Sequence, residues 1–341
     1  MSVYGQGRNL CSWLALLGMA TLVTSAAAAT HRFKMLSSQR VRSIMRCSDI
    51  ESLRTHDFPG VLKERVPGTP GHEEVRKYIV SRLSQLNCSR WNITEHSFED
   101  DTPLGRKPFT NIIATLDPHV SKRLVLAAHY DSKILTGKQF LAATDSALPV
   151  ALLLDLALTL DEKLLERELA DYSLQLIFTD GEEAFRYWTA TDSLYGARRL
   201  ATDMAGELLS VEDNNGLEAM TAFVLLDLIG AASPSFHDMY EPGSQLFQRM
   251  VKIERRLHDD GHLEGHSSHY FNERTAYGLY HIEDDHKPFL DKGVPIVHLI
   301  AYPFPSVWHK SSDNAQAIDW NTVANLRKIF LVFLHEYFHL R

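Results

Sequence analysis

Several short polar clusters carry the residue types that bind metal ions or move protons. Histidines and carboxylates gather at His129-Tyr130-Asp131, at Asp145, at Asp180-Gly181-Glu182-Glu183, at Asp227 and at residues 302–309. A catalytic zinc site takes three such ligands and leaves a fourth position open. The candidate ligands are His129, Asp131, Asp145, Glu182, Glu183, Asp227, Asp284, Asp285, His286, His298 and His309. Because no cysteine is among them, the predicted site uses nitrogen and oxygen ligands.

Two adjacent glutamates form the most informative cluster. Glu182 and Glu183 follow the apolar run at residues 174–178 after a short turn. Neighbouring side chains on an extended chain point to opposite sides. We therefore expect one carboxylate to bind a metal ion and the other to face the substrate.

The elements that position these clusters alternate between strand and helix patterns. Apolar runs of strand length occur at residues 111–116, 123–128, 174–178, 222–228 and 295–300. Helical spacing of apolar residues occurs at 73–86, 148–160, 194–204, 245–257 and 321–339, with Asp192 as the expected N-cap of the third helix. This alternation predicts an α/β sheet covered on both faces. Polar clusters directly follow four of the five strands, at the sheet edge where such folds bind ligands.

Composition and charge limit the partners. The chain has 341 residues, 45% of them hydrophobic, and its 43 acidic residues exceed its 35 basic residues, for a formal charge of -8. This balance offers no basic excess to neutralise phosphates, so we expect no nucleic-acid partner. The sequence has no internal repeat and no composition break from residue 50 onward, which predicts one catalytic domain at residues 49–341.

The N-terminus has the pattern of a targeting segment. Arg8 precedes an apolar run at residues 10–23, and small residues follow at 25–29. This pattern is typical of a secretory signal peptide, which we place at residues 1–29, before a linker at 30–48. The apolar run is too short to predict a stable membrane span. A mitochondrial presequence is the alternative, because arginines precede the first acidic residue, Asp49.

Sequons and cysteines also bear on whether the protein is secreted. The tripeptides Asn87-Cys88-Ser89 and Asn92-Ile93-Thr94 are acceptor sequences for N-glycosylation and favour secretion. Only Cys47 and Cys88 lie beyond the expected signal peptide, which is too few for a disulfide framework.

Seven strings in the sequence resemble those of the animal glutaminyl cyclases, or glutaminyl-peptide cyclotransferases. They are LVLAAHYDSK, ATDSALPVALLLDLA, FTDGEEAF, DSLYGARRLA, LLDLIGA, DDHKPF and PIVHLIAYPFPSVWH, and they occur in the family's order. Because that family is related to zinc aminopeptidases, the resemblance implies a single domain with a mixed central β-sheet flanked by helices on both faces. It also implies cyclisation of N-terminal glutaminyl residues of peptides to pyroglutamate with release of ammonia, and weak activity on N-terminal glutamate.

The resemblance implies a ligand set and a proton carrier. Asp145, Glu183 and His309 would hold one zinc ion per chain, and Glu182 would be the general acid and base. Zinc can stabilise a developing oxyanion as a Lewis acid, and a carboxylate can carry a proton from the attacking amine to the leaving ammonia.

It also implies an acid pair and an aromatic pocket. Asp227 and Asp284 would form a hydrogen-bonded pair near Glu182, with His298 in the same network. The substrate pocket would be formed by Trp188, His298, Phe304 and Trp308. We further expect a monomer that acts on peptides and proteins with N-terminal glutamine.

Two other functions remain open on the residue types alone. His129, Asp145, Glu183, Asp227 and His309 are also types that could bind two zinc ions, sharing Asp145, in an aminopeptidase. An inactive binding protein on the same fold is a second alternative. The segments DDHKPF and PFPSVWH favour the cyclase, because a hydrolase does not require the acid and the tryptophan that they contain.

Two histidine patterns are expected to be unrelated to metal binding. The C-terminal sequence His335-Glu336-Tyr337-Phe338-His339 matches HExxH, but only two residues follow it, so no downstream third ligand is available. His262, His266 and His269 lie in a polar segment and are expected to be solvated.

The sequence departs from the family pattern at two positions. Ala128 and Val150 stand where many animal members carry a cysteine pair near the active site. The departure argues against a stabilising disulfide there and leaves the expected catalytic positions unchanged.

Overall fold

The computed structural model describes residues 31–206 and 216–341. The chain divides into two units, Met1–Arg32 and Phe33–Arg341, and the fold is that of the second unit. The expected signal peptide at residues 1–29 lies outside the described residues, and the expected domain limits stay predictions.

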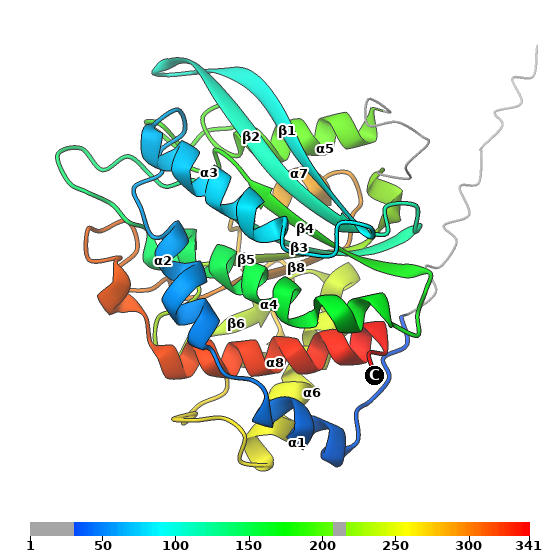
Figure 1. Cartoon of the computed structure of the whole chain (residues 1–341). Helices are drawn as coiled ribbons and strands as arrows, with labels where there is room; N and C mark the ends of the chain where they lie inside the picture. The colour runs from blue at the N-terminus through cyan, green and yellow to red at the C-terminus, as the bar shows by residue number, and fades with distance from the viewer. Residues whose placement is uncertain (1–30, 207–215) are drawn as a thin grey trace, which may run out of the picture. The chain divides into compact units, whose positions relative to one another are not determined.

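A six-stranded sheet forms the centre of this unit, with strand order β1-β2-β4-β3-β5-β8 (Figure 1). Its strands are β1 (Trp91–Thr102), β2 (Gly105–Leu116), β3 (Lys122–His129), β4 (Tyr172–Thr179), β5 (Met220–Asp227) and β8 (Ile296–Ile300). The neighbours β4, β3, β5 and β8 are parallel, whereas β2 pairs antiparallel with both β1 and β4. The central sheet is therefore mixed.

The predicted strands are all present, and one strand of the sheet was missed. β1 alternates between half-buried and exposed residues along most of its length, as the outer strand of a hairpin with β2. Its polar sequence contains no apolar run, because only one side of an edge strand packs on the protein. A second, two-stranded sheet pairs β6 (Phe236–Asp238) with β7 (Phe271–Thr275), which also lack apolar runs of strand length.

Helices cover both faces of the central sheet. The helices of this unit are α1 (Ser38–Arg46), α2 (Phe58–Val61), α3 (Pro70–Leu83), α4 (Leu148–Leu165), α5 (Tyr195–Ala205), α6 (Ser244–Asp259), α7 (Lys287–Leu290) and α8 (Trp320–Phe338). Leu124 and Leu126 of β3 belong to the core shared with α3, α4 and α8, whereas Val125 and Ala127 belong to a separate core with α5 and α7. Alternate residues of a buried strand thus serve two apolar layers, which explains its continuous apolar run.

The start of α5 differs from the prediction. Asp192 does not cap this helix; its carboxylate accepts the backbone N–H groups of Phe185, Arg186 and Tyr187 at 2.9 to 3.0 Å. Leu194 occupies the N-cap position without a side-chain hydrogen bond. The residue type favoured a cap, but the preceding loop offered it three N–H donors.

The segment at residues 30–48, expected to be a linker, contains α1. Val41 and Ile44 of this helix are buried, and the backbone N–H of Leu36 donates to Glu336 of α8 at 3.0 Å. Arg256 of α6 donates in turn to the carbonyl of Leu36 at 2.7 Å. Much of this segment is therefore packed on the catalytic fold.

One helical stretch among the described residues, Ala143–Leu165, is long and apolar enough to cross a membrane. It consists of a π-helical turn, Ala143–Ala147, followed by α4. Because 89% of its most apolar window is buried inside the fold, its composition is explained by its place in the core.

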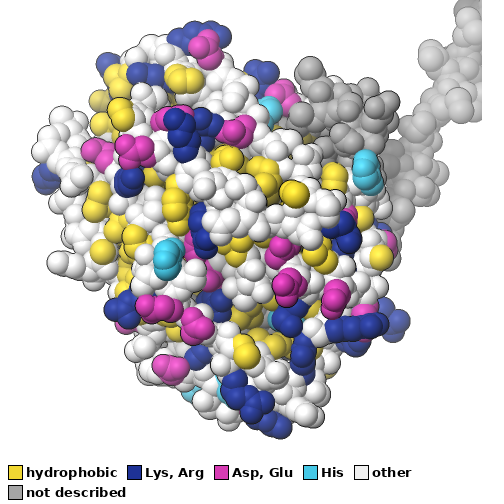
Figure 2. All heavy atoms as spheres, in the orientation of Figure 1, with side chains coloured by type: hydrophobic (Ala, Val, Ile, Leu, Met, Phe, Trp, Pro, Cys, Tyr) yellow, Lys and Arg dark blue, Asp and Glu magenta, His cyan; other side chains and the backbone are white. Residues whose placement is uncertain are grey.

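On the face seen in Figure 2, acidic and basic side chains lie among one another.

Candidate active site

The parallel strands bring the predicted polar clusters to one edge of the sheet. His129 ends β3 and pairs with Thr179, the last residue of the neighbouring β4, directly before Asp180. Asp227 ends β5 on the other side of β3. Residues 302–309 follow β8. The carboxyl ends of parallel strands meet at the same edge, as expected for a ligand site in this fold class.

A cavity of about 500 Å³ opens at this edge. Its lining includes the predicted residues Asp145, Glu182, Glu183, Trp188, Asp227, Asp284, Phe304, Trp308 and His309. His298 is not among the lining residues. The structure therefore assembles the predicted residues, apart from His298, around one concave site of the size that small-molecule sites have.

Asp145, Glu183 and His309 form a compact group of possible metal ligands. The Nε2 atom of His309 lies 3.1 Å from Oε1 of Glu183 and 3.5 Å from Oδ2 of Asp145. In a tetrahedral site with bonds of about 2.0 Å, neighbouring donor atoms are about 3.3 Å apart. Oδ2 of Asp145 is buried and makes no hydrogen bond. These distances and this unpartnered oxygen fit a zinc ion.

The loop that carries Asp145 is fixed by contacts from distant parts of the chain. The buried guanidinium of Arg65 donates to the carbonyls of Leu141 at 2.6 Å, Ala142 at 3.0 Å and Asp145 at 3.3 Å. The carboxylate of Asp313 accepts the N–H of Thr144 at 2.9 Å. Such outer contacts orient metal ligands before the ion binds.

The two glutamates are positioned by the turn that leaves β4. Gly181 has φ +67, and an added Cβ atom would lie 2.5 Å from the ring of Phe109. Asp131 accepts the N–H of Glu182 at 3.0 Å and that of Glu183 at 3.2 Å. Asp131 is thus a positioning residue that holds both backbone groups. Glu183 enters the ligand group, while Glu182 lines the cavity outside it.

A second ligand group shares Asp145 with the first. It consists of His129, Asp145 and Asp227. The Nε2 atom of His129 lies 3.1 Å from Asp145 and 3.5 Å from Asp227. The carboxylate of Asp227 also accepts the hydroxyl of Ser146 and, at 2.7 Å, the N–H of Leu228. Geometry alone therefore allows two neighbouring cation positions.

Asp227 and Asp284, which were expected to form a hydrogen-bonded pair, contact other groups instead. No hydrogen bond joins Asp227 and Asp284 within the described ranges. Instead, Oδ2 of Asp284 accepts from Nε2 of His298 at 2.7 Å, and its Oδ1 accepts the N–H of Asp285 at 2.6 Å. His298 is buried in β8 behind the cavity wall. His298 is therefore absent from the residues that line the cavity, and it contacts Asp284 from behind, within the network expected for it.

Aromatic rings line the remaining wall. Trp308 stacks on His309 with ring centroids 4.1 Å apart, and Phe304 lies edge-on to Trp308 at 4.8 Å. The indole of Trp188 donates to Glu283 at 3.1 Å. Trp188 and Trp308 remain more than a third exposed, so they present apolar surface to a ligand at the cavity mouth.

The buried carboxylates strongly perturb one another. Burial and the charge of Glu183 raise the pKa of Asp145 to about 7, despite the opposing effect of His129. Burial likewise raises the pKa of Glu182 well above its usual range. Burial opposes protonation of His129, but the carboxylates of Asp131, Asp145 and Asp227 outweigh it and raise its pKa well above 6.5. A site that holds protons on crowded ligands is one where a cation can replace them.

Sequence reasoning missed several charged residues of the site, among them Lys133 and Arg65. Lys133 donates to Oε2 of Glu183 at 3.0 Å, and Arg65 holds the Asp145 loop. Lys133 stands five residues after the end of the strand predicted at residues 123–128, which was a usable signal. Arg65 lies in a turn-rich segment far from any cluster, and nothing local marked it.

The residues of the HExxH pattern have other contacts and positions in the fold. Nδ1 of His335 donates to the carbonyl of Leu331 at 2.8 Å, and the carboxylate of Glu336 binds Arg249 and the N–H of Leu36. His339 is the C-cap of α8. His335 and His339 belong to none of the ligand groups found among residues 31–206 and 216–341.

Comparison with known proteins defines the class. Residues 111–334 match the profile of Peptidase family M28, so the chain belongs to that family. The glutaminyl-peptide cyclotransferase of Boiga irregularis is 42% identical over 323 residues, which cover 91% of this chain and 88% of the relative. The crystal structure of Macrostomum lignano glutaminyl cyclase matches with a TM-score of 0.83 and 39% identity, covering 91% and 95% of the two chains. The chain is therefore a member of the glutaminyl-peptide cyclotransferase family.

A solved aminopeptidase structure has a similar fold. A leucine aminopeptidase precursor from Bacteroides thetaiotaomicron matches with a TM-score of 0.67, covering 84% of this chain and 97% of that one. At 20% identity this likeness concerns the fold alone. It confirms the predicted α/β architecture of the zinc-aminopeptidase type.

Proposed function

We propose that the protein is a zinc-dependent glutaminyl-peptide cyclotransferase, which closes an N-terminal glutaminyl residue into pyroglutamate and releases ammonia. The observation that carries this proposal is the juxtaposition of Glu182 with Asp145, Glu183 and His309 in one aromatic-walled cavity. Membership of the cyclotransferase family supports the same activity. The substrates are peptides and proteins that begin with glutamine, and weakly those that begin with glutamate.

Asp145, Glu183 and His309 are the proposed ligands of one zinc ion. When bound, the ion acts as a Lewis acid toward the oxygen of the substrate's side-chain amide. Two contacts favour a single ion over a pair. Asp227 already accepts two hydrogen bonds through Oδ1.

Glu182 is the proposed proton carrier. The α-amino nitrogen of the substrate attacks the carbon of its own side-chain amide, a new C–N bond forms, and the bond to the amide nitrogen breaks. Glu182 takes a proton from the amine and returns one to the departing nitrogen, which leaves as ammonia. Its burial and the nearby charges of Glu183 and Asp284 raise the pKa of Glu182, so its carboxylate is a stronger base toward the amine and its protonated form can return the proton to the leaving nitrogen.

The aromatic wall is proposed to hold the substrate in a cyclising conformation. Ring closure brings two groups of one residue together, so its rate depends on orientation within a tight pocket. Trp188, Phe304 and Trp308 supply rigid apolar surfaces for this purpose. The same surfaces limit the access of water, which would otherwise favour hydrolysis.

An aminopeptidase is the alternative, favoured by the two ligand groups that share Asp145. It would need two ions at the sheet edge. The zinc content of His129→Ala, which removes a ligand of the second position only, distinguishes the two cases. It should equal that of the wild type if the active site holds one ion and be lower by one ion per chain if it holds two.

The experiment for the proposed roles follows ammonia released from a glutaminyl dipeptide amide. We expect Glu182→Gln to lower kcat by about 100- to 10,000-fold while zinc remains bound. A strong chelator should abolish activity, and added zinc should restore it. Undiminished activity of Glu182→Gln would refute the role of Glu182, and activity that persists without metal would refute the role of zinc.

We further propose that residues 1–29 are a signal peptide, that the protein is a secreted glycoprotein, and that it is a monomer. Asn87 and Asn92 of the two sequons are exposed, as glycan attachment requires. The residues proposed to bind zinc and to carry the proton all come from this chain, which supports the proposal that the monomer is active. Expression in animal cells followed by glycosidase treatment and light scattering would test these points; retention in mitochondria would support the alternative targeting.

A further inference from the structure

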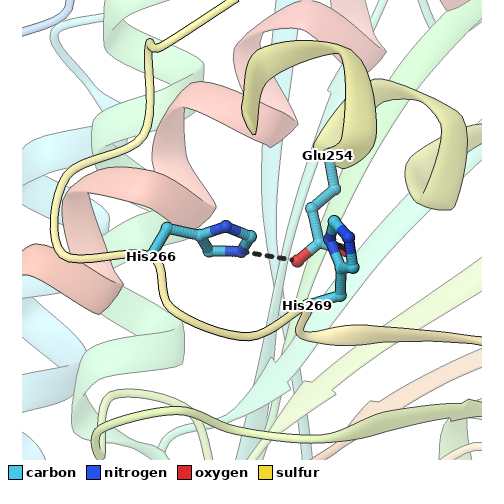
Figure 3. Close-up of side chains that lie close together, drawn as sticks. All are labelled: Glu254, His266 and His269. Carbon is cyan, nitrogen blue, oxygen red and sulfur yellow. Dashed lines mark hydrogen bonds and ion pairs between the residues drawn. The ribbon is translucent and has the colours of Figure 1, made fainter. Parts of the chain in front are cut away.

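A second cluster of histidines lies outside the active site, between α6 and the segment before β7. Glu254 and His258 are one turn apart on α6, and His266 and His269 lie on the loop that follows. None of the four lines the active-site cavity. His266 was expected to be solvated, but its side chain is only 1% exposed. Figure 3 shows the ring of His266, on the loop, pointing toward the carboxylate of Glu254, on α6.

The donor atoms of this cluster have the spacing of a coordination shell. Nε2 of His266 lies 3.0 Å from Oε1 of Glu254, and Nδ1 of His269 lies 3.6 Å from Oε2. Both values bracket the distance of about 3.3 Å between neighbouring ligands of a tetrahedral zinc ion. Each of the three residues offers one ligand atom, and these atoms lie within 4.8 Å of one another, as they do in the ligand groups of the active site.

Charge also favours a cation. Glu254 is fully buried, and no lysine or arginine of the described residues forms an ion pair with it; its partners are His266, His269 and the N–H groups of Tyr270 and Phe271. A buried carboxylate without a permanent positive partner is costly unless it is neutralised or binds a metal ion.

His258 provides the outer contact that a histidine ligand requires. Its Nδ1 lies 3.0 Å from Nδ1 of His266, so His266 can donate that N–H while presenting Nε2 to an ion. Histidine ligands commonly donate their second ring nitrogen in this way. The side chain of His269 is 43% exposed, which leaves an entry path and an open position for water.

We propose that Glu254, His266 and His269 form a second metal site that takes a divalent transition ion of the zinc type, with His258 as the positioning residue. A carboxylate and two imidazoles suit zinc and disfavour magnesium and calcium, which prefer oxygen ligands. The site joins α6 to the loop that leads into β7, and its role is to stabilise this part of the fold. It is independent of the proposed active-site ion.

The test is the zinc content of the full-length protein after metal removal and dialysis against zinc. The wild type should hold one more zinc ion per chain than His269→Ala. The matched control is His262→Ala, a histidine of the same loop outside the cluster, which should retain the wild-type content. Both variants should keep the wild-type cyclisation rate and circular dichroism, which separates loss of this site from loss of the active site or of the fold.

A second readout uses thermal unfolding. Added zinc should raise the Tm of the wild type and of His262→Ala more than that of His269→Ala, and magnesium should not reproduce the difference. Equal zinc content in the wild type and His269→Ala, with equal Tm responses, would overturn the proposal. Because each comparison is a difference between variants with intact active sites, its outcome does not depend on the number of ions at the active site.

Discussion

His335 of α8 should make the fold sensitive to acid. Its side chain is 2% exposed; Nδ1 donates to the carbonyl of Leu331, and the buried Nε2 has no hydrogen-bond partner. Burial disfavours the charged imidazolium and lowers the pKa of His335 to about 4, against 6.5 for an exposed histidine. The folded protein therefore keeps this histidine neutral over a pH range in which the unfolded chain protonates it.

The sign and size of the effect follow from proton linkage. Because the pKa is lower in the folded state, the contribution of His335 to stability is complete above pH 6.5 and is lost as the pH falls toward 4. Between these values the unfolded chain binds one more proton, which changes the free energy of unfolding by about 1.4 kcal/mol per pH unit. At about pH 5 the loss amounts to about 2 kcal/mol.

The assay compares the wild type with His335→Leu by equilibrium urea unfolding at about pH 7.5 and about pH 5. The difference in free energy of unfolding between the two proteins should shift by about 2 kcal/mol in favour of the variant at the lower pH. Acid loss of zinc affects both proteins and cancels in the difference. His262→Ala, which changes a loop histidine, serves as the control and should show no comparable shift. A difference that is the same at both pH values would refute the reasoning.

Three further predictions concern charged and aromatic contacts. Arg327→Met leaves the buried carboxylate of Asp155 without its partner, so urea unfolding should show a loss of about 3–5 kcal/mol, and a smaller loss when Asp155→Leu is added; equal losses would contradict the pairing. Lys133→Met removes the contact to Glu183 and should weaken zinc affinity by about 10- to 100-fold in competition with a chelator; unchanged affinity would show that Lys133 does not orient this ligand. Trp308→Ala removes the ring stacked on the proposed ligand His309 and should lower kcat/KM by about tenfold without altering circular dichroism; an unchanged kcat/KM would exclude a role for the ring.

The sequence was sufficient for the parts of the fold that are buried on both sides. The strands at the centre of the sheet are apolar throughout because helices cover both faces, so their runs were visible without a structure. β1 was missed because an edge strand needs few apolar residues. Asp192 was misassigned because its residue type suits a cap, while the N–H groups that it accepts lie in a loop whose path cannot be derived locally.

The residues of the candidate site also fall into those that could be predicted from the sequence and those that could not. Residues that directly follow predicted strands, such as Glu182 and Glu183, were placed correctly because the sheet edge brings them together. Arg65 and Asp313 were not predicted, since they act on the Asp145 loop through contacts between segments far apart in the chain. The solvated assignment of His266 failed for a related reason, because its buried partner lies on a different element, α6.

The identity of the product tests the central claim most directly. Purified protein is incubated with a peptide that begins with glutamine, and the products are analysed by mass spectrometry. Cyclisation predicts a full-length peptide that is lighter by one ammonia molecule, with no free glutamine, and this product should be absent with Glu182→Gln. Free glutamine together with a peptide shortened by one residue would identify an aminopeptidase and contradict the account.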